Sequence, residues 1–329
     1  MFQSLFRSVA VSAMAYFVVS VVGLLLVPLL IAEYGLAGFG QITLARLFLP
    51  TGALAVLDLG VGETATQAVA GARVDGNWRR CARMLTVSLG AAVLVGAIAG
   101  AGLVTCAPFV PRWASVAQDA AGLSRVLVLT GVLLPLIFAS LVLEAVAKGF
   151  ENYFAQRAIE VVAALTYAGL ALGAIWKDLG LVWVCYALLA SLVLRAVLAG
   201  ATALRLLKPI GVRPAGPEAA DRSEFAARSR VMAVSKLLGA CQTQLAPFLI
   251  AFLLGPAALG TFDALTRLPR LAKAVLGLLN STILPAAARL DNADDVANMR
   301  RLGELGMLLL ALVSMPPLVG SMAFSEPLL

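Results

Sequence analysis

The chain has 329 residues, of which 61% are hydrophobic and only 13% are charged, and its mean hydropathy is +0.95. Because a soluble domain carries about 25% charged residues, this chain could not cover a water-facing surface. The composition excludes a cytosolic enzyme, a disordered protein and, despite a net charge of +7, a nucleic-acid-binding protein. It predicts an all-α polytopic membrane protein, since the apolar runs have the length of membrane-spanning helices.

A membrane-spanning helix needs about 20 apolar residues, and by that length the sequence predicts about nine such helices. The first apolar run follows Arg7 and continues to Ile31. It is longer than the ~7–15 residues of the apolar region of a signal peptide, so we interpret it as an uncleaved span. The second and eighth spans contain prolines (Pro50; Pro269 and Pro285), which predicts a kink in each. The predicted spans are 8–32, 37–69, 83–107, 124–147, 155–176, 180–206, 229–254, 257–288 and 302–324.

The basic residues between the spans predict a cytoplasmic N-terminus, because cytoplasmic loops carry an excess of Lys and Arg. With that orientation the outer segments hold only Arg112, Arg125 and Lys177. The longest polar stretch, 207–228, then lies inside and is interpreted as a linker between two lobes. Its amphipathic part, 217–230, is expected to lie along the membrane surface. The basic residues expected inside are Arg7, Arg73, Arg79, Arg80, Arg83, Lys148, Arg157, Arg205, Lys208, Arg213, Arg222, Arg228, Arg230, Arg289, Arg300 and Arg301.

An internal repeat relates the first two spans to the seventh and eighth. A proline followed by two glycines occurs twice with an offset of 219 or 220, as Pro28, Gly35, Gly40 and as Pro247, Gly255, Gly260. The basic residue Arg46 also falls one position from the counterpart of Arg267. Six spans separate the two copies, so both halves have the same orientation, as in transporters with parallel repeats.

The repeat predicts a first six-helix lobe over 1–206, the linker at 207–228, and the first three helices of a second lobe over 229–329. A complete second lobe would give about twelve helices. We therefore expect the chain to be truncated or a fragment of a longer protein.

Ionisable residues within spans are candidates for function, because each costs about 2.5–3.5 kcal/mol to place in the bilayer. The acids clearly inside are Asp58 and Asp263, which are candidates for ion coupling. The other acids near spans, namely Glu63, Glu144, Glu160 and Glu304, are expected to reach the interface from helix ends. The basic residues within spans are Arg46, Arg195, Lys236, Arg267, Arg270 and Lys273.

These basic residues outnumber the available acids, and the excess predicts an anionic ligand such as phosphate or pyrophosphate. On the eighth span Asp263, Arg267 and Arg270 share one helical face, with Lys273 at its edge. Simple pairing between charges is the competing interpretation for Asp263 with Arg267 and for Arg195 with a carboxylate of the first lobe. For Lys236, at the start of the seventh span, the competing interpretation is that its side chain extends to the membrane interface.

Two glycine-rich pieces, 35–40 and 60–62, do not follow strands and do not continue as a phosphate-binding loop. We interpret them as sites of turns and close helix packing. The sequence also contains no histidine, and its four cysteines, Cys81, Cys106, Cys185 and Cys241, form no CxxC pair and are interpreted as small buried residues. We expect no metal and no cofactor.

The motif 28–40, PLLIAEYGLAGFG, followed by Asp58-Leu-Gly60 resembles the polysaccharide and O-antigen flippases of the multidrug/oligosaccharidyl-lipid/polysaccharide (MOP) flippase superfamily. Further matches are 147–154, AKGFENYF, and 254–260, LGPAALG, with 285–288, PAAA. The resemblance covers nearly the whole chain. It implies a non-enzymatic flippase that moves an undecaprenyl-pyrophosphate-linked oligosaccharide across the bacterial inner membrane by alternating access, for cell-surface polysaccharide or O-antigen synthesis.

The resemblance further implies a cationic central cavity, in which Arg46, Arg267, Arg270 and Lys273 would line the substrate path, and a polysaccharide polymerase as a candidate partner. Two other functions stay open. A drug or cation antiporter of the same superfamily would use intramembrane acids rather than bases. A membrane enzyme of polysaccharide assembly would carry a large outer loop, whereas the longest one expected here is 108–123.

Overall fold

The computed structural model describes residues 2–116, 119–211, 215–216 and 218–267, together with residue 269 and six positions between 303 and 315. All regular structure in these residues is helical. Residues 21–263 form one compact unit, and residues 2–20 with the described residues from 264 onward belong to another. The elements are α1 (Phe2–Leu47), η1 (Ala53–Leu57), α2 (Val61–Asp75), α3 (Trp78–Cys106), α4 (Val110–Trp113), α5 (Ala120–Gly149), α6 (Tyr153–Trp176), α7 (Leu181–Leu207), η2 (Lys208–Ile210) and α8 (Ala219–Leu253).

Six helices of the described residues are long and apolar enough to cross a membrane. Four of them, α3, α5, α6 and α7, begin and end within five residues of the predicted spans. Three of them follow polar caps that the sequence provides: Asn77 Oδ1 accepts the Arg80 N–H before α3, Asp119 Oδ1 accepts the Gly122 N–H before α5, and Asn152 Oδ1 accepts the Ala155 N–H before α6. The prediction of a polytopic all-α membrane protein is confirmed. All but six positions of the predicted ninth span, and residues 268 and 270–288 of the eighth, lie outside the described residues.

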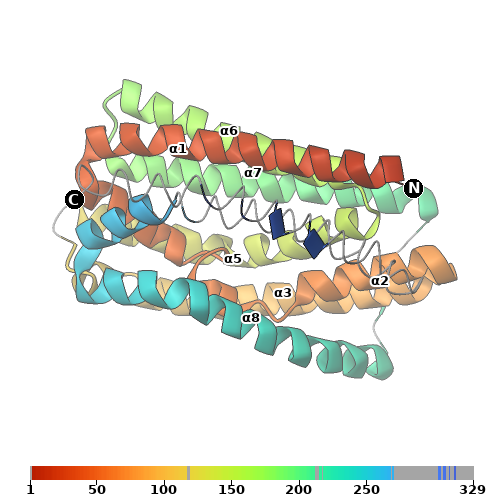
Figure 1. Cartoon of the computed structure of the whole chain (residues 1–329). Helices are drawn as coiled ribbons and strands as arrows, with labels where there is room; N and C mark the ends of the chain where they lie inside the picture. The colour runs from red at the N-terminus through yellow and green to blue at the C-terminus, as the bar shows by residue number, and fades with distance from the viewer. Residues whose placement is uncertain are drawn as a thin grey trace. The chain divides into compact units, whose positions relative to one another are not determined.

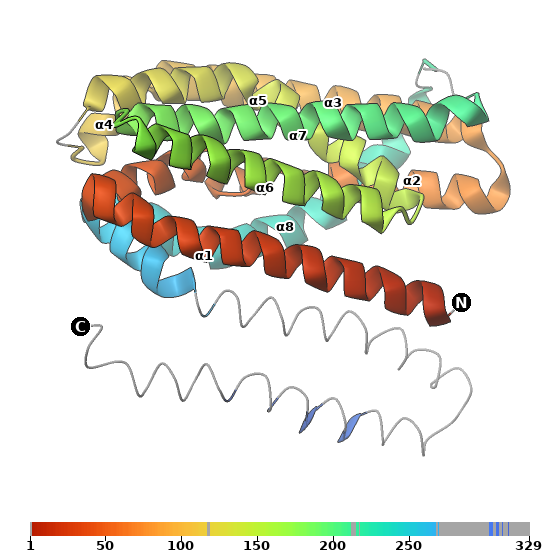
Figure 2. The same ribbon diagram turned by 90° about the horizontal axis from the view of Figure 1, so that it is seen from above.

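The loop expected between the first two spans does not form. Instead two helical segments of α1 join directly at Gly35, the one residue there that leaves the helical conformation, with φ 69° and ψ 174°. Glycine reaches this left-handed region because it has no Cβ. The chain turns back at this point, and residues 36–47 run in the opposite direction (Figure 2).

The predicted second span, 37–69, is broken in the middle. Helix α1 ends at Leu47, the short η1 follows, and α2 begins only at Val61. Two residues explain the break. Pro50 lacks an N–H for a helical hydrogen bond. A Cβ on Gly52 would lie 2.5 Å from the Arg46 carbonyl oxygen, so only glycine fits the turn that follows.

The seventh span begins earlier than predicted, because α8 starts at Ala219 rather than at residue 229. The segment expected to lie along the membrane surface is therefore the first part of this helix. A capping box starts it: Glu218 and Asp221 each accept a hydrogen bond from the other's backbone N–H. The division into lobes at 1–206, 207–228 and 229–329 stays a prediction.

Helix α5 lies at the centre of the 21–263 unit and packs against α2, α3 and α7. It is the most deeply buried of the candidate spans. Near one end, Val146 of α5 packs with Val69, Cys81 and Ala203, and the rings of Trp78 and Phe150 stack beside them. The α2–α3, α5–α6 and α7–α8 connections all lie at this end (Figure 1). We call it the basic end, because the helix ends that meet there carry arginines and lysines such as Arg80, Lys148 and Arg205; the other is the opposite end.

The internal repeat is visible in the backbone at the opposite end. Gly255 has a φ of 86° and so repeats the left-handed conformation of Gly35, 220 residues earlier. The helical stretches that follow the two glycines then touch. A Cβ on Gly40 would lie 1.7 Å from the carbonyl oxygen of Pro256, and a Cβ on Gly260 would lie 2.4 Å from that of Leu36.

Pro256 and Gly260 are the counterparts of Leu36 and Gly40 at the same offset of 220, so the contact is reciprocal. Only glycine fits at either position, because any side chain would overlap the backbone of the other helix. This supports the interpretation of the glycine-rich segment 35–40 as a turn and a packing site. Of the four cysteines predicted to be small buried residues, Cys81 and Cys185 are buried. The prediction is wrong for Cys106 and Cys241, which are exposed.

Candidate functional site

The broken second span carries the first group of intramembrane charges. Asp58 ends η1, and its Oδ1 accepts a hydrogen bond of 3.0 Å from the Gly60 N–H, which holds the chain in the turn before α2. Gly60 has a left-handed φ of 71° and lies against Met232 of α8. The turn therefore presents Asp58 to α8, and it confirms the interpretation of the second glycine-rich piece.

Lys236 of α8 lies between two carboxylates of the broken span. Its Nζ is 2.9 Å from Asp58 Oδ2 and 2.7 Å from Glu63 Oε1. Asp58 is the most buried of the three, with 13% of its side chain exposed, against 36% for Lys236 and 41% for Glu63. We call these three residues the Lys236 triad. Its formal charge is −1, so in this conformation the lysine is neutralised rather than available to an anion.

Arg46 lies in the last turn of α1, directly before the break, and is half-buried. Its guanidinium carbon is 5.1 Å from the centre of the Tyr167 ring, a cation–π contact. Among the described residues no carboxylate pairs with it. The buried Tyr167 hydroxyl likewise has no hydrogen-bond partner in the described part of the chain. A cation and a hydroxyl donor, neither with an acceptor among the residues that the structure describes, therefore lie together between α1 and α6.

Arg195 of α7 is engaged in a different way. Its Nε and Nη2 donate to the two carboxylate oxygens of Glu144 on α5, at 2.6 and 2.8 Å. Glu144 is 4% exposed, so it does not reach the interface from a helix end as expected. This bidentate pair corresponds to the competing interpretation, in which Arg195 braces two helices.

The remaining predicted residues lie on the eighth span. Asp263 is buried and Arg267 is half-buried, both in the helical stretch that follows Gly255. Arg270 and Lys273 lie outside the described residues. Their place in a cationic cavity therefore stays a prediction, as does the idea that the charges of the second and eighth spans face each other.

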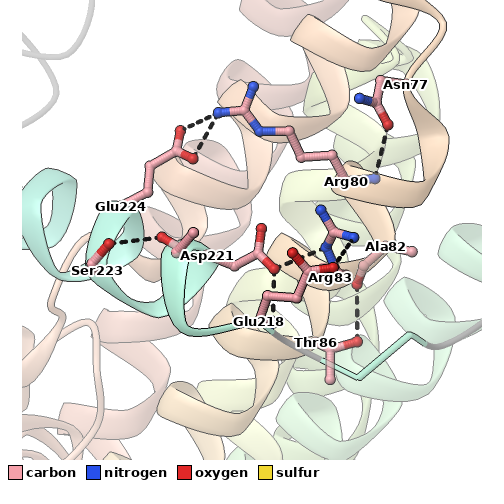
Figure 3. Close-up of polar contacts among 10 residues, drawn as sticks. Asn77, Arg80, Ala82, Arg83, Thr86, Glu218, Asp221, Ser223 and Glu224 are labelled. Carbon is pink, nitrogen blue, oxygen red and sulfur yellow. Dashed lines mark hydrogen bonds and ion pairs between the residues drawn. The ribbon is translucent and has the colours of Figure 1, made fainter.

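A set of ion pairs joins α3 and α8 at the basic end (Figure 3). Arg80 Nη2 contacts Glu224 at 2.6 Å, and Arg83 contacts both Glu218 and Asp221, at 2.6 and 2.8 Å. Asp221 is only 5% exposed, so its pair with Arg83 is the most shielded contact of the set. The polar first part of α8 is thus held against α3 by side chains that come from sequence positions about 140 residues apart.

Three functional candidates were not identified from the sequence. Glu63 and Glu144 were expected near the interface, and Tyr167 has no local signature, because its role depends on contact with a residue 121 positions away. The described residues contain no group of three or more His, Cys, Asp or Glu side chains able to hold a metal ion.

The fold is that of a known class of membrane transporter. The chain is similar to a multidrug resistance MATE family transporter of the MOP superfamily, in its inward-facing conformation, with a TM-score of 0.67 and 14% sequence identity. The similarity covers 97% of this chain and 74% of that transporter.

A family model described as polysaccharide biosynthesis protein matches residues 5–291, and the chain therefore belongs to this family. The resemblance seen in the sequence motifs is confirmed. A comparison with curated proteins found no match.

Proposed function

We propose that the chain is a flippase that moves a polyprenyl-pyrophosphate-linked oligosaccharide across the membrane for cell-surface polysaccharide or O-antigen synthesis. The observation that carries the proposal is Arg46 over Tyr167: a cation beside the break of the second span, with no carboxylate among the described residues to neutralise it. An unpaired charge costs about 2.5–3.5 kcal/mol within a bilayer, and binding of an anion offsets that cost. Membership of the polysaccharide biosynthesis family makes a lipid-linked sugar phosphate the natural anion.

The chemistry of the two side chains suits a pyrophosphate. An arginine presents several N–H donors in a planar fork and stays charged at all physiological pH values, so it binds phosphate oxygens in a bidentate manner. The Tyr167 hydroxyl adds one more donor, and its ring holds the guanidinium in place. In this proposal Arg267, Arg270 and Lys273 contribute further cations, and Lys236 becomes available when it leaves Asp58 and Glu63.

A drug or cation antiporter is the second candidate, and the Lys236 triad is the observation that favours it. Two carboxylates around one lysine leave a net negative charge beside the break, which is the charge that a cation would require. The structural neighbour named as a multidrug resistance transporter fits this candidate as well. In the flippase proposal the same carboxylates, with Asp263, serve as sites of ion coupling.

The arrangement of charges supports an orientation with the N-terminus in the cytoplasm. The ends of α2, α3, α5, α6 and α7 that meet at the basic end (Figure 1) carry Arg73, Arg80, Lys148, Arg157 and Arg205. The basic residues of the opposite end are Arg112 of α4, Arg125 in the first turns of α5, and Lys177 directly after α6. Because the cytoplasmic segments of membrane proteins carry an excess of Lys and Arg, we orient the basic end toward the cytoplasm. We place the protein in the bacterial inner membrane, where a polysaccharide polymerase is a candidate partner.

The test is complementation of a flippase-deficient strain, with surface polysaccharide and membrane protein level measured together. Arg46→Ala should lower transport about 10- to 100-fold at an unchanged protein level, because a charge-assisted hydrogen bond contributes about 1.5–3 kcal/mol. Arg46→Lys, which keeps the charge but loses the fork, should retain part of the activity. Arg125→Ala is the matched control, because Arg125 is an exposed arginine at the opposite end.

Full complementation by Arg46→Ala would overturn the anion site. The antiporter candidate is tested in the same strain: expression of the chain should leave drug susceptibility unchanged if the flippase proposal is right. Increased drug resistance that depends on Asp58, without restored polysaccharide, would favour the second candidate.

A further inference from the structure

A groove of about 370 Å³ lies between α6 and α7, where the two helices meet at the opposite end. Its wall on α6 is formed by Gly169 and Gly173, where an added Cβ would meet no atom within 4 Å. Its wall on α7 is formed by Trp183 and Ala190, and Lys177 lies at its mouth. We propose that this groove binds one phospholipid molecule, with an acyl chain against the two glycines and the headgroup phosphate at Lys177.

The position of the groove matches one leaflet of a bilayer. Lys177 directly follows Trp176, the last residue of a candidate span, so the groove begins where the helices leave the membrane. From Lys177 to Gly169 the helical rise gives a depth of about 12 Å. Half of a ~30 Å hydrocarbon core is about 15 Å, so the groove reaches most of the way to the midplane.

The side chains around the groove have the character of a membrane interface. Trp176 is 86% exposed and Trp183 is 54% exposed, and the Trp183 ring meets that of Tyr186 edge to face at 5.9 Å. Tryptophan and tyrosine are enriched at the level of the lipid headgroups. Lys177 at the same level supplies a positive charge for a phosphate. The charge of Lys177 therefore suits the headgroup of a lipid, and the apolar walls of the groove suit its acyl chain.

An acyl chain is also the occupant that the surroundings favour. Below the mouth the lining is glycine, alanine, leucine and aromatic rings, which offer water few partners. An empty groove would forgo the dispersion contacts of its walls. The Gly169-Leu-Ala-Leu-Gly173 spacing is also that of helix-pairing motifs. A second helix would, however, have to displace the exposed Trp183 and cover the charge of Lys177, so we choose the lipid.

Native mass spectrometry of the purified chain with added phosphatidylglycerol tests the proposal. We expect about one lipid retained per chain, and loss of it in Gly173→Leu, whose side chain fills the groove. Lys177→Gln should weaken retention about fivefold, because a basic residue near the headgroups contributes about 1 kcal/mol. Gly102→Leu is the matched control, since Gly102 also has open space but lies on α3. Ala190→Leu closes the groove from the α7 side and replaces Gly173→Leu if that variant fails to fold.

A second measurement locates the lipid. Phosphatidylglycerol with brominated acyl chains should quench the fluorescence of Trp183, measured as the difference between the chain and its Trp183→Phe variant. Equal lipid retention in the chain and in both groove-filling variants would overturn the proposal. So would a two-chain particle without bound lipid that becomes a single chain in Gly173→Leu, because the groove would then be a contact between two copies of the protein.

Discussion

Replacing Lys236 by methionine should leave the two carboxylates of the Lys236 triad facing each other. The distances of 2.9 and 2.7 Å to the lysine nitrogen place Asp58 Oδ2 and Glu63 Oε1 within about 5.6 Å of one another. At an effective dielectric constant of ~20 two unit charges at that distance repel by about 3 kcal/mol. Because Lys236 and Glu63 are 36% and 41% exposed, screening reduces the effect, and we expect a loss of about 1–2 kcal/mol.

Thermal unfolding in detergent measures this loss, and for a protein of this size it corresponds to a fall in Tm of about 1.5–3 °C. Adding Glu63→Gln to Lys236→Met removes the repulsion and should recover most of the difference. Lys208→Met is the matched control, because Lys208 is an exposed lysine at the end of α7. If the Tm of Lys236→Met equals that of the control and adding Glu63→Gln does not raise it, the three side chains do not interact as described and the reasoning is refuted.

Two further predictions concern contacts between helices. Arg195→Met should lower the free energy of unfolding by about 3 kcal/mol and with it the amount of protein in the membrane, because it leaves the buried Glu144 without its partner. Combining Arg195→Met with Glu144→Gln should recover most of the loss. Immunoblotting of membranes and thermal unfolding check both variants, and equal loss in the single and double variants would contradict the pairing. Gly40→Val and Gly260→Val should each prevent the close contact at the opposite end, at a cost of about 1–3 kcal/mol. Crosslinking between cysteines introduced beside the two glycines should fall in either variant, and unchanged crosslinking would show that the contact tolerates a side chain.

The sequence predicts those parts of the fold that depend on hydropathy and local capping. Helices α3, α5, α6 and α7 have uniform apolar runs, and polar N-caps such as Asn77 and Asn152 precede three of them, so their limits can be found from single segments. The break in the second span could not be located in this way. Its residues are apolar enough to continue a helix, and Pro50 alone predicts a kink, not the 3-10 turn and the left-handed Gly60 that follow.

For the candidate site, the sequence likewise predicts the charged residues but not their partners. That Arg46, Arg195, Lys236 and Asp58 carry charge within spans is visible from their positions in the sequence. Which of them are neutralised depends on partners from distant segments: Glu144 for Arg195, and Asp58 for Lys236. Hydropathy cannot separate a paired cation from an unpaired one, because both occupy the same place in an apolar run.

The reciprocal contact of Gly40 with Pro256 and of Gly260 with Leu36 has the geometry of a two-fold interface within one chain. A half-length chain that carried this motif would meet a second copy of itself through the same surface, as in isologous homodimers. In such a dimer one substitution would change the interface at two places at once. In the present chain the two places are encoded separately, so each half of the contact can vary while the other is kept.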